Sequence, residues 1–598
     1  PQKDGRWTVE FPAMPASETA YQMTFAGDDN FSFNNILIGD VWICSGQSNM
    51  EWPVRKVFNS AYELAKADIP AIRSFTVPNE ISLTPQSDFS SGRWNVATYE
   101  NAANISAVAY FFAKNLYQTE KIPIGLICSY WGGTAVEAWT SLESISSHPD
   151  YAQPVEKLLA TKNTPDFFDS LRIKSKDAYQ QWQEKIKSID PGYKEKWYSP
   201  EYQANEWFSM LAPAYWEDNG LADFDGVVWL RKDVYIPSQM LGKPLQLDME
   251  ILKDYDTTWF NGEEIGFTSW NAGRRIYTVP AGLIREGKNT IVVRLENIKG
   301  SGGFSSKHDS ELYIKELMAD KQALNIPLSG LWQFKPAMRT GDYPAKPQDL
   351  TSIHTPSCLY NAKIAPLTNL SVKGAIWYQG ETNAFRACQY RSLFPLLISD
   401  WRKQFRQDFP FLFVQLAGHK AITKEPVEET WAELREAQTM TLSVPQTGMA
   451  VAIDLGDPSD VHPTHKQEVG RRLALEAEKI AYHKPEIITS PLYQKMQIEG
   501  NKIRLYFSGS DNGLIAKNGK LSGFAIADDS KKFVWANAEI EGNTVVVWND
   551  NIQNPAAVRY AYAGSPVEGN GANLYNKERF PASPFRTDDW EWITLNNK

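Results

Sequence analysis

Near-continuous apolar runs that stop at small polar residues limit the possible folds of this chain. "ILIGDVWICSG" from Ile36 and "IPIGLICSYWGG" from Ile122 are two such runs, and "VAYFFAKNLYQ" between them has helical spacing. A strand buried on both faces of a parallel sheet has this pattern, because neither face alternates between core and solvent. The pattern predicts an α/β fold from Ile36 to about Trp139.

The hydrophobic period changes to two between about Gly220 and Asp320. "LQLDMEI" from Leu245 places its apolar residues on one face, and "WFNGEEIGF" carries an Asn-Gly hairpin signal at Asn261. The α/β pattern resumes at "VKGAIWYQGE", and short alternating runs return after about Pro491. An all-β module of about 100 residues therefore interrupts the α/β unit, and a second β-unit follows it.

These patterns predict the domain organisation of the 598-residue chain. The first residues resemble the last strands of a β-unit ("DGRWTVEFPAM", "YQMTFAGD"), whose start, with any export signal, we expect before Pro1. The predicted segments are 1–30 as a remnant of an N-terminal β-domain, 31–218 and 323–488 as the two parts of the α/β domain, 219–322 as the inserted β-sandwich and 489–598 as a C-terminal β-domain.

Composition and charge exclude several classes of protein. The net charge is −10, and the sequence has no block of basic residues of the kind that binds a phosphate backbone. Both observations argue against a nucleic-acid partner. No apolar run approaches the roughly 18 residues of a membrane span. The four cysteines lack metal-site spacing and read as small buried side chains, with an oxidised pair left open. Aromatic residues make up 13% of the chain, which suits sugar-binding surfaces and β-sandwich cores equally well.

Ser48 follows the first buried strand, in "VWICSGQSNMEWPV". Open α/β sheets place their ligands at the carboxyl ends of their strands, so a nucleophile there is plausible. A serine at a strand end more often caps a helix or turn, so Ser48 alone does not establish catalysis.

A serine nucleophile needs a base, and the sequence has seven histidines. His462 lies in "DLGDPSDVHPTHKQ", just beyond the last α/β strand, from where it can reach another strand end. His419 in "LAGHK" also follows a strand and is the rival base, whereas His465 is expected to face solvent.

Donors for an oxyanion hole follow two further strands. Gly132 and Gly133 come directly after the second strand, where a glycine N–H can approach a ligand closely. Asn383 ends "YQGETN" after the next central strand and offers a side-chain amide. Three strand ends thus carry Ser, Gly and Asn, and a fourth carries His.

The motifs "GQSNM", "GGT", "YQGETNA" and "DVHP", in this order, resemble those of the SGNH (GDSL-like) hydrolases, and specifically the sialate O-acetylesterase family of carbohydrate esterases. The resemblance covers essentially the whole chain. The elbow G-x-S-x-G of α/β-hydrolases is absent, since Met50 stands at its last glycine. The resemblance implies a three-layer α/β/α fold with a parallel sheet, split by a jelly-roll-like insert similar to galactose-binding modules.

The resemblance also implies an activity. It implies a serine esterase, periplasmic or secreted, that removes 9-O-acetyl groups from sialic acids through an acetyl-enzyme, without metal or cofactor. The implied roles are Ser48 as nucleophile, His462 as general base and then acid, the N–H groups of Ser48 and Gly133 with the Asn383 amide as oxyanion hole, and Gln379 and Glu381 in the pocket wall.

The sequence departs from the family at the acid of the triad. The family places it three residues before the histidine, where this chain has Ser459, whereas Asp460 lies two before His462. Either Asp460 reaches Nδ1 of His462, or a backbone carbonyl near Ser459 fixes the imidazole and leaves a Ser-His dyad. The short i, i+2 spacing favours the dyad slightly.

Two other functions are compatible with the sequence. An acetylxylan or hemicellulose acetylesterase shares the motifs, and a non-catalytic carbohydrate-binding protein would use the β-units and aromatics instead. An arginine near the pocket, Arg55 or Arg386, would favour the carboxylate of sialate. Tryptophans that flank the motifs offer a sugar platform or core packing: Trp52, Trp131 and Trp377. The sequence does not indicate the oligomeric state.

Overall fold

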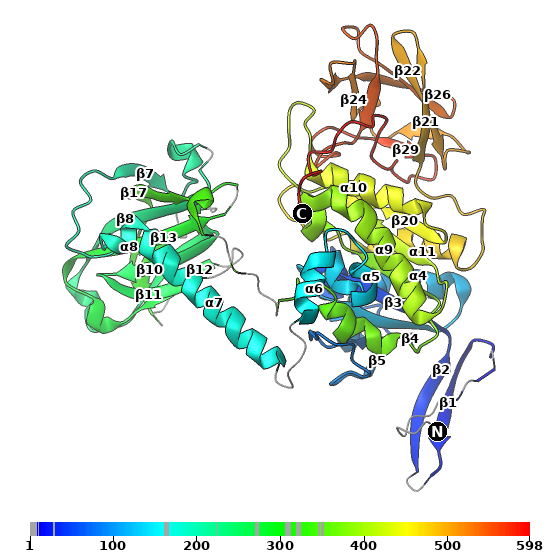
Figure 1. Cartoon of the computed structure of the whole chain (residues 1–598), viewed down its shortest axis with the longest axis horizontal. Helices are drawn as coiled ribbons and strands as arrows, with labels where there is room; N and C mark the ends of the chain where they lie inside the picture. The colour runs from blue at the N-terminus through cyan, green and yellow to red at the C-terminus, as the bar shows by residue number, and fades with distance from the viewer. Residues whose placement is uncertain are drawn as a thin grey trace. The chain divides into compact units, whose positions relative to one another are not determined.

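The computed structural model separates into two compact units, Pro1–Phe168 with Thr351–Lys598, and Asp169–Leu350 (Figure 1). It describes residues 9, 11–12, 14–27, 30–160, 167–222, 224–268, 274–298, 300–304, 312–317, 324–344, 347 and 352–598. Most of the predicted strand "DGRWTVEFPAM" lies outside the described residues.

A seven-stranded sheet forms the centre of the first unit, in the order β20-β19-β18-β3-β6-β4-β5. Neighbouring strands are parallel except for the edge pair β4 and β5. The mixed α/β architecture with a parallel sheet is therefore confirmed. The strands are β3 (Asp40–Gly46), β4 (Ile69–Thr76), β5 (Trp94–Ala97), β6 (Ile124–Tyr130), β18 (Gly374–Tyr378), β19 (Phe411–Gln415) and β20 (Thr447–Val451).

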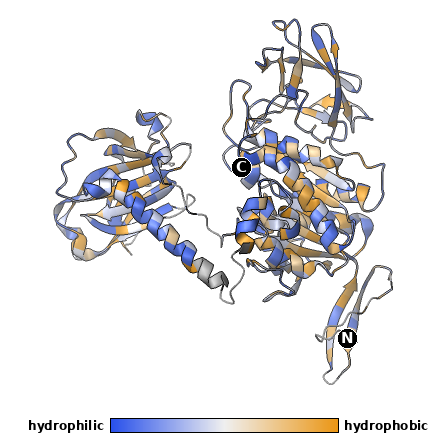
Figure 2. Ribbon diagram, viewed as in Figure 1, coloured by the Kyte–Doolittle hydropathy of each residue, from blue (hydrophilic) through white to orange (hydrophobic). Residues whose placement is uncertain are grey.

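Helices cover this sheet in two packed pairs, α4 (Ala107–Glu120) with α11 (Lys466–Ile480) and α9 (Ala387–Phe405) with α10 (Thr430–Met440) (Figure 1). Apolar side chains of the sheet and helices form one buried core that includes Trp42, Trp377 and Trp401. The sheet strands are mainly hydrophobic in Figure 2. The shorter helices of the unit are α1 (Ser48–Glu51), α2 (Ser60–Leu64), α3 (Tyr99–Ala102), α5 (Leu142–Ile145) and α6 (Ala152–Ala160).

The register of the three central strands explains why the first buried strand stops at Gly46. Gly46 pairs with Tyr130 of β6 and with Tyr378 of β18, so the three strands end at one level. Gly46 has a φ of 138°, and an added Cβ would lie 2.1 Å from the Tyr378 carbonyl oxygen, which only glycine avoids. The segments that follow these strands therefore leave the sheet together.

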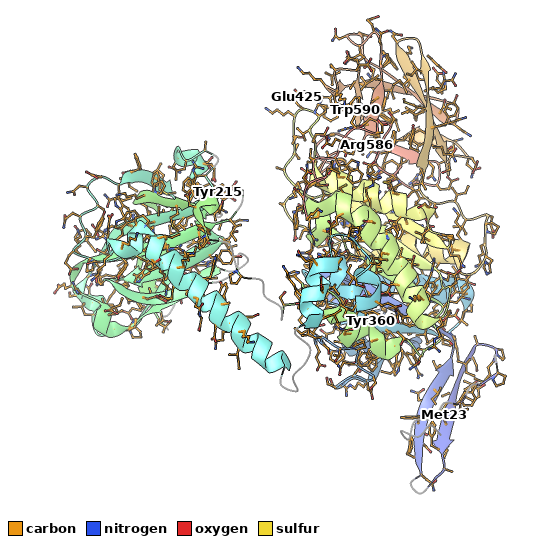
Figure 3. All side chains as sticks on the ribbon, viewed as in Figure 1. Met23, Tyr215, Tyr360, Glu425, Arg586 and Trp590 are labelled. Atoms are coloured by element: carbon orange, nitrogen blue, oxygen red, sulfur yellow. The ribbon has the colours of Figure 1, made fainter. Side chains whose placement is uncertain are left out.

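Two β-units flank the sheet within the first unit. The hairpin of β1 (Ser17–Phe25) and β2 (Phe31–Ile38) precedes it, so the predicted boundary at residue 30 falls in the hairpin turn. In Figure 3, Met23 marks this hairpin, Tyr360 the α/β part, and Arg586 and Trp590 the C-terminal β-unit. The C-terminal strands are β21 (Leu492–Glu499), β22 (Lys502–Ser508), β23 (Leu514–Ala516), β24 (Phe524–Ala527), β25 (Val534–Trp535), β26 (Asn537–Glu541), β27 (Thr544–Trp548), β28 (Ala557–Tyr560), β29 (Leu574–Asn576) and β30 (Phe585–Arg586).

The second unit contains two larger sheets, β11-β10-β13-β8-β17-β7 and β12-β9-β15-β16. It is wider than the predicted insert 219–322, because β7 and β17 complete the sheet of β8 and the helices α7 and α8 belong to the same unit. Its elements are α7 (Phe167–Ile189), α8 (Pro191–Lys194), β7 (Phe208–Ala212), β8 (Gly226–Ile236), β9 (Leu245–Lys253), β10 (Tyr255–Phe260), β11 (Glu263–Thr268), β12 (Arg274–Val279), β13 (Gly287–Asn297), β14 (Gly303–Phe304), β15 (Tyr313–Glu316), β16 (Asn325–Pro327) and β17 (Gly330–Arg339).

All four cysteines carry free thiols, which resolves the open disulfide question. Cys44 and Cys128 face each other across β3 and β6, and burial raises the pKa of the Cys44 thiol. Among the described residues, no helix is both long and apolar enough to span a bilayer.

Candidate active site

Ser48 begins the short helix α1, two residues after β3 ends. The side chain of Gln47 holds this turn against the segment after β18, because its Oε1 accepts the N–H groups of Gly380 (3.4 Å) and Thr382 (3.3 Å). Ser48 itself is partly exposed, while its neighbour Asn49 is buried. The predicted nucleophile thus lies at the carboxyl edge of the parallel sheet, on a turn that the Gln47 side chain holds in place.

His462 meets Ser48 across the carboxyl edge of the sheet. Its Nε2 lies 2.9 Å from Ser48 Oγ, and Trp52 stacks on its ring at 4.9 Å between centroids with an interplanar angle of 13°. Trp52 therefore fixes the plane of the imidazole. The other two candidate histidines contact aromatic rings instead: His419 lies by Trp431 and His465 stacks on Phe58.

Asp460 reaches His462 by the first of the two predicted routes. Its Oδ1 lies 3.3 Å from Nδ1 of His462 and also accepts the backbone N–H of His462 at 2.8 Å. The second bond closes an Asx-type turn, which folds the i carboxylate back over residue i+2. The sequence analysis slightly favoured a backbone carbonyl near Ser459 as the partner of Nδ1, because it did not consider this turn. The geometry favours the Asp460 carboxylate as that partner.

The electrostatics keep the imidazole neutral. Burial lowers the pKa of His462, and the nearby Lys466 lowers it further, while the Asp460 carboxylate opposes both effects. A neutral imidazole with Nδ1–H directed at Asp460 leaves Nε2 free to accept the hydroxyl proton of Ser48. The arrangement can perform general-base catalysis at neutral pH.

The predicted oxyanion donors follow β6 and β18. Gly133 is exposed with a φ of 73°, and no described residue accepts its N–H or that of Ser48. Asn383 is fully buried, and its amide orientation is set by Val136 N–H (3.1 Å) and Gln379 Nε2 (2.6 Å), which both donate to Oδ1. Asn383 Nδ2 donates one hydrogen to Glu137 at 3.1 Å and keeps a second one, since a primary amide carries two.

Gln379 and Arg386 support the site from behind rather than lining it. Gln379 is fully buried and also donates to Thr134, at 3.1 Å. The Arg386 guanidinium binds Glu137 at 2.6 Å, and both side chains are largely buried, so the cation is already matched. Glu137 therefore connects Arg386 to Asn383, and the structure gives Arg386 a positioning role in place of the predicted substrate contact.

The other side chains that were predicted to contact the sugar or its carboxylate lie partly in the core and partly on the surface. Trp377 is fully buried in the sheet core, which excludes it from a sugar platform. Trp131 is partly exposed beside the glycines, with the Lys363 ammonium 5.7 Å from its ring centroid. Arg55 is exposed and donates to Asn104.

A buried polar network beside Ser48 escaped the sequence analysis. Asn49 Nδ2 donates to Glu381 Oε1 (2.6 Å) and to the carbonyl of Val461 (2.9 Å), and its Oδ1 accepts from Lys466. Burial raises the pKa of Glu381 and lowers that of Lys466 to about 7. Asn49 thereby ties the helix of Ser48 to the loop of His462. Its position next to Ser48 in "GQSNM" was the available signal.

Glu51 fixes the position of the segment Gly132–Gly133. Its Oε2 accepts the N–H of Gly132 at 2.7 Å, which holds that segment against α1. Within the described part of the chain, no cluster of three or more His, Cys, Asp and Glu side chains is arranged to hold a metal ion.

Comparisons with known proteins agree with this chemistry. The family described as "carbohydrate esterase, sialic acid-specific acetylesterase" matches residues 38–173 and 353–479. Sialate O-acetylesterase of Mus musculus is 24% identical over 94% of this chain and 79% of its own length, and that of Homo sapiens is 22% identical over 92% and 75%. The crystal structure of a carbohydrate acetylesterase from Xanthomonas citri is 27% identical, with a TM-score of 0.62 over 98% of this chain and 89% of that chain.

Proposed function

We propose that this chain removes O-acetyl groups from sialic acids through an acetyl-enzyme on Ser48, because it is similar to the sialic acid-specific acetylesterase family and to the sialate O-acetylesterases of Mus musculus and Homo sapiens. The observation that carries the mechanism is the 2.9 Å contact between Ser48 Oγ and His462 Nε2. We assign the 9-O-acetyl group as the preferred ester.

The geometry supports a two-step acyl transfer. His462 accepts the proton of Ser48 as Oγ attacks the acetyl carbonyl, and then donates it to the sugar oxygen as the ester C–O bond breaks. In the second step water attacks the acetyl carbonyl while His462 accepts a proton from the water. The bond between the acetyl carbon and Ser48 Oγ then breaks, His462 returns the proton to Oγ, and acetate leaves. Asp460 holds the imidazole tautomer and stabilises the imidazolium.

The test compares acetate release from 9-O-acetylated sialic acid with release from acetylated xylan. We expect the sialic acid ester to have the higher kcat/KM. A higher value for xylan would favour the hemicellulose acetylesterase. Release from neither substrate would contradict the esterase proposal and favour the carbohydrate-binding protein.

Asn383→Ala is expected to lower kcat by about 10²- to 10³-fold, because one preorganised oxyanion donor is lost. KM should change less, since the bond strengthens as charge develops in the transition state. Steady-state kinetics with 9-O-acetylated sialic acid measure both parameters. Arg386→Lys is the companion variant: it keeps a cation near Glu137, so a fall as large as that of Asn383→Ala would mean that both changes merely disturb the buried network.

The pH dependence of kcat/KM is expected to follow His462. The base must be neutral, so activity rises with pH through its pKa, and burial places that midpoint below the ordinary value of about 6.5. Asp460→Asn should move the midpoint lower still, because the carboxylate raises the pKa of His462. An acid limb centred above 6.5 in the wild type would contradict this assignment.

Three finer assignments are also proposals. The strand-end order of Ser, Gly, Asn and His supports the SGNH class and its three-layer arrangement. The two sheets of the second unit are compatible with the jelly-roll-like description of the insert. Location in the periplasm or outside the cell rests on the family resemblance alone.

A further inference from the structure

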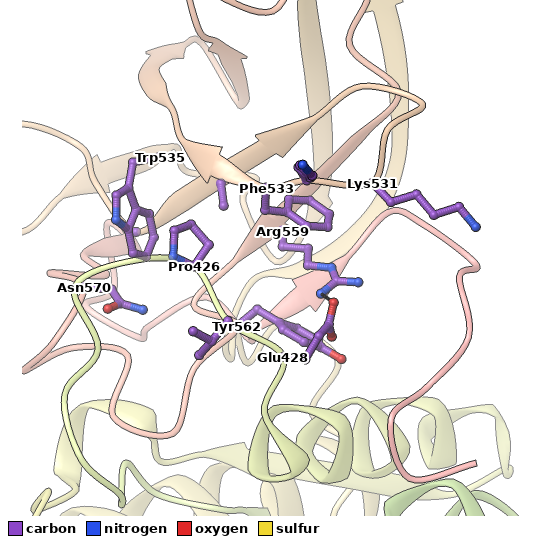
Figure 4. Close-up of a pocket in the computed structure, with 12 residues that line it drawn as sticks. Pro426, Glu428, Lys531, Phe533, Trp535, Arg559, Tyr562 and Asn570 are labelled. Atoms are coloured by element: carbon purple, nitrogen blue, oxygen red, sulfur yellow. Dashed lines mark hydrogen bonds and ion pairs between the residues drawn. The ribbon is translucent and has the colours of Figure 1, made fainter. Parts of the chain in front are cut away.

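A pocket of about 390 Å³ lies within the first unit, where the C-terminal β-unit meets the segment Pro426–Glu428 of the α/β part (Figure 4). Its lining includes neither Ser48 nor His462. In Figure 4, Trp535 and Asn570 lie at one end of the pocket, and Phe533, Arg559, Tyr562 and Glu428 at the other.

Two polar atoms in the pocket lack a partner among the described residues, Tyr562 Oη and Asn570 Oδ1. Both atoms are buried, and Tyr562 as a whole is only 8% exposed. Buried hydroxyl and amide groups in folded proteins are almost always hydrogen-bonded, because losing water without replacing it costs free energy. These atoms are therefore suited to a ligand that supplies both a donor and an acceptor.

The guanidinium charge of Arg559 is matched within the protein. Arg559 forms two bonds with Asp588, at 2.9 and 3.0 Å, and a third with Glu428 at 2.6 Å. Its guanidinium also lies over the rings of Phe533 (4.2 Å) and Tyr562 (4.6 Å). Arg559 is therefore not a free cation for an anion, whereas the exposed Lys531 and Lys532 also line the pocket and the partly exposed Glu428 carboxylate can accept hydroxyl hydrogens.

Aromatic side chains give the pocket flat apolar faces. The indole N–H of Trp535 donates to the Lys424 carbonyl at 2.9 Å, which holds the ring against the segment around Pro426. Phe533 is partly exposed at the other end. Flat apolar faces beside a few single donors and acceptors match a sugar ring, whose C–H face is apolar and whose hydroxyls donate and accept.

The pocket is connected to the loop that carries His462. Gly564 accepts the N–H of His419 at 2.9 Å, and Ser565 donates to Lys420 at 2.7 Å. Lys420 in turn donates its N–H to Pro458, at 3.3 Å, two residues before Asp460. The chain between Tyr562 and Asn570 is therefore hydrogen-bonded to His419 and Lys420, and Lys420 is bonded to the loop that carries His462.

We propose that this pocket binds one sugar residue of the glycan whose sialic acid is deacetylated at Ser48. The proposal rests on the proposed function for the choice of glycan. It assigns Trp535 to contact the sugar ring, Tyr562 to hydrogen-bond a hydroxyl, and Glu428 to accept from another.

The test uses the full chain and 3′-sialyllactose, which carries no acetyl ester and is not turned over. Hydrogen–deuterium exchange is expected to show protection of peptides over 531–535 and 557–570 when the trisaccharide is added. Trp535→Ala should remove this protection, and Tyr562→Phe should raise the Kd at this site about fivefold by deleting one hydroxyl. Tyr506→Phe, on β22 outside the pocket, is the matched control and should leave the Kd unchanged.

Protection that is absent from 531–535 and 557–570, or that survives Trp535→Ala, would overturn the proposal. A fall in Kd or no change in Tyr562→Phe would also contradict it, and this variant should fold because its hydroxyl has no described partner. Acetate release from the 9-O-acetylated monosaccharide is expected to be unchanged in both variants. Failure of the wild type in that assay would overturn the proposed function and leave the binding result standing.

Discussion

Ser48→Ala is expected to lower kcat for acetate release from 9-O-acetylated sialic acid by about three orders of magnitude or more. The change removes the hydroxyl oxygen that lies 2.9 Å from His462 Nε2, and without this oxygen no acetyl-enzyme can form. The fold should tolerate alanine, because the Ser48 hydroxyl is partly exposed at the start of a four-residue helix.

Ser45→Ala is the matched control. Ser45 lies three residues earlier, inside β3, and its buried hydroxyl has no partner among the described residues. We expect kcat within about twofold of the wild type. Equal losses in the two variants would indicate damage to the strand end and would contradict Ser48 as nucleophile. A burst of sugar release before steady state in the wild type, absent in Ser48→Ala, would report the covalent intermediate directly.

Asp460→Asn is expected to reduce kcat by about 10⁴-fold, as for a triad in which the acid sets the imidazole tautomer. The asparagine can still accept the His462 N–H and keep the Asx-type turn, so the loss would report the charge and tautomer rather than the loop. Acetate release at several pH values measures the effect.

Asp457→Asn tests the same loop without touching the imidazole. The Asp457 carboxylate accepts from the N–H and hydroxyl of Ser459, at 2.8 and 2.7 Å. A change of no more than about threefold is expected. A near-normal rate for Asp460→Asn would support the Ser-His dyad and make the 3.3 Å contact with Nδ1 incidental.

The fold was predictable where one hydrophobic pattern extends over a whole helix or strand. The apolar run from Ile36 to Gly46 was expected to be one strand, but it forms the end of β2 and all of β3. The run before Trp131 is β6, and the helical spacing between the two runs is α4. The alternating runs in the middle of the chain are strands of the second unit. Its limits were predicted too narrowly, because β7 and β17 join the sheet of β8 through pairing between strands distant in sequence.

The candidate site was predictable to the level of strand ends. Parallel strands in register bring their carboxyl ends to one edge, so Ser48, Gly133, Asn383 and His462 were expected near one another from their positions in the chain. Which of the neighbouring polar side chains can contact a substrate depends on how they pack in the folded chain. Gln379 and Arg386 follow the same strand as Asn383, yet both are buried in the network of Glu137.

The α/β class, the interruption by β-structure and the four strand ends that carry polar groups follow from the amino-acid sequence alone. These properties depend on the period of hydrophobic residues, which can be read within each segment of the sequence. Three contacts emerge only in the folded chain: Asp460 reaches His462, Asn49 joins the two loops, and Glu137 orients Asn383. These contacts depend on turn dihedrals and on pairs up to 412 residues apart, so no local pattern encodes them.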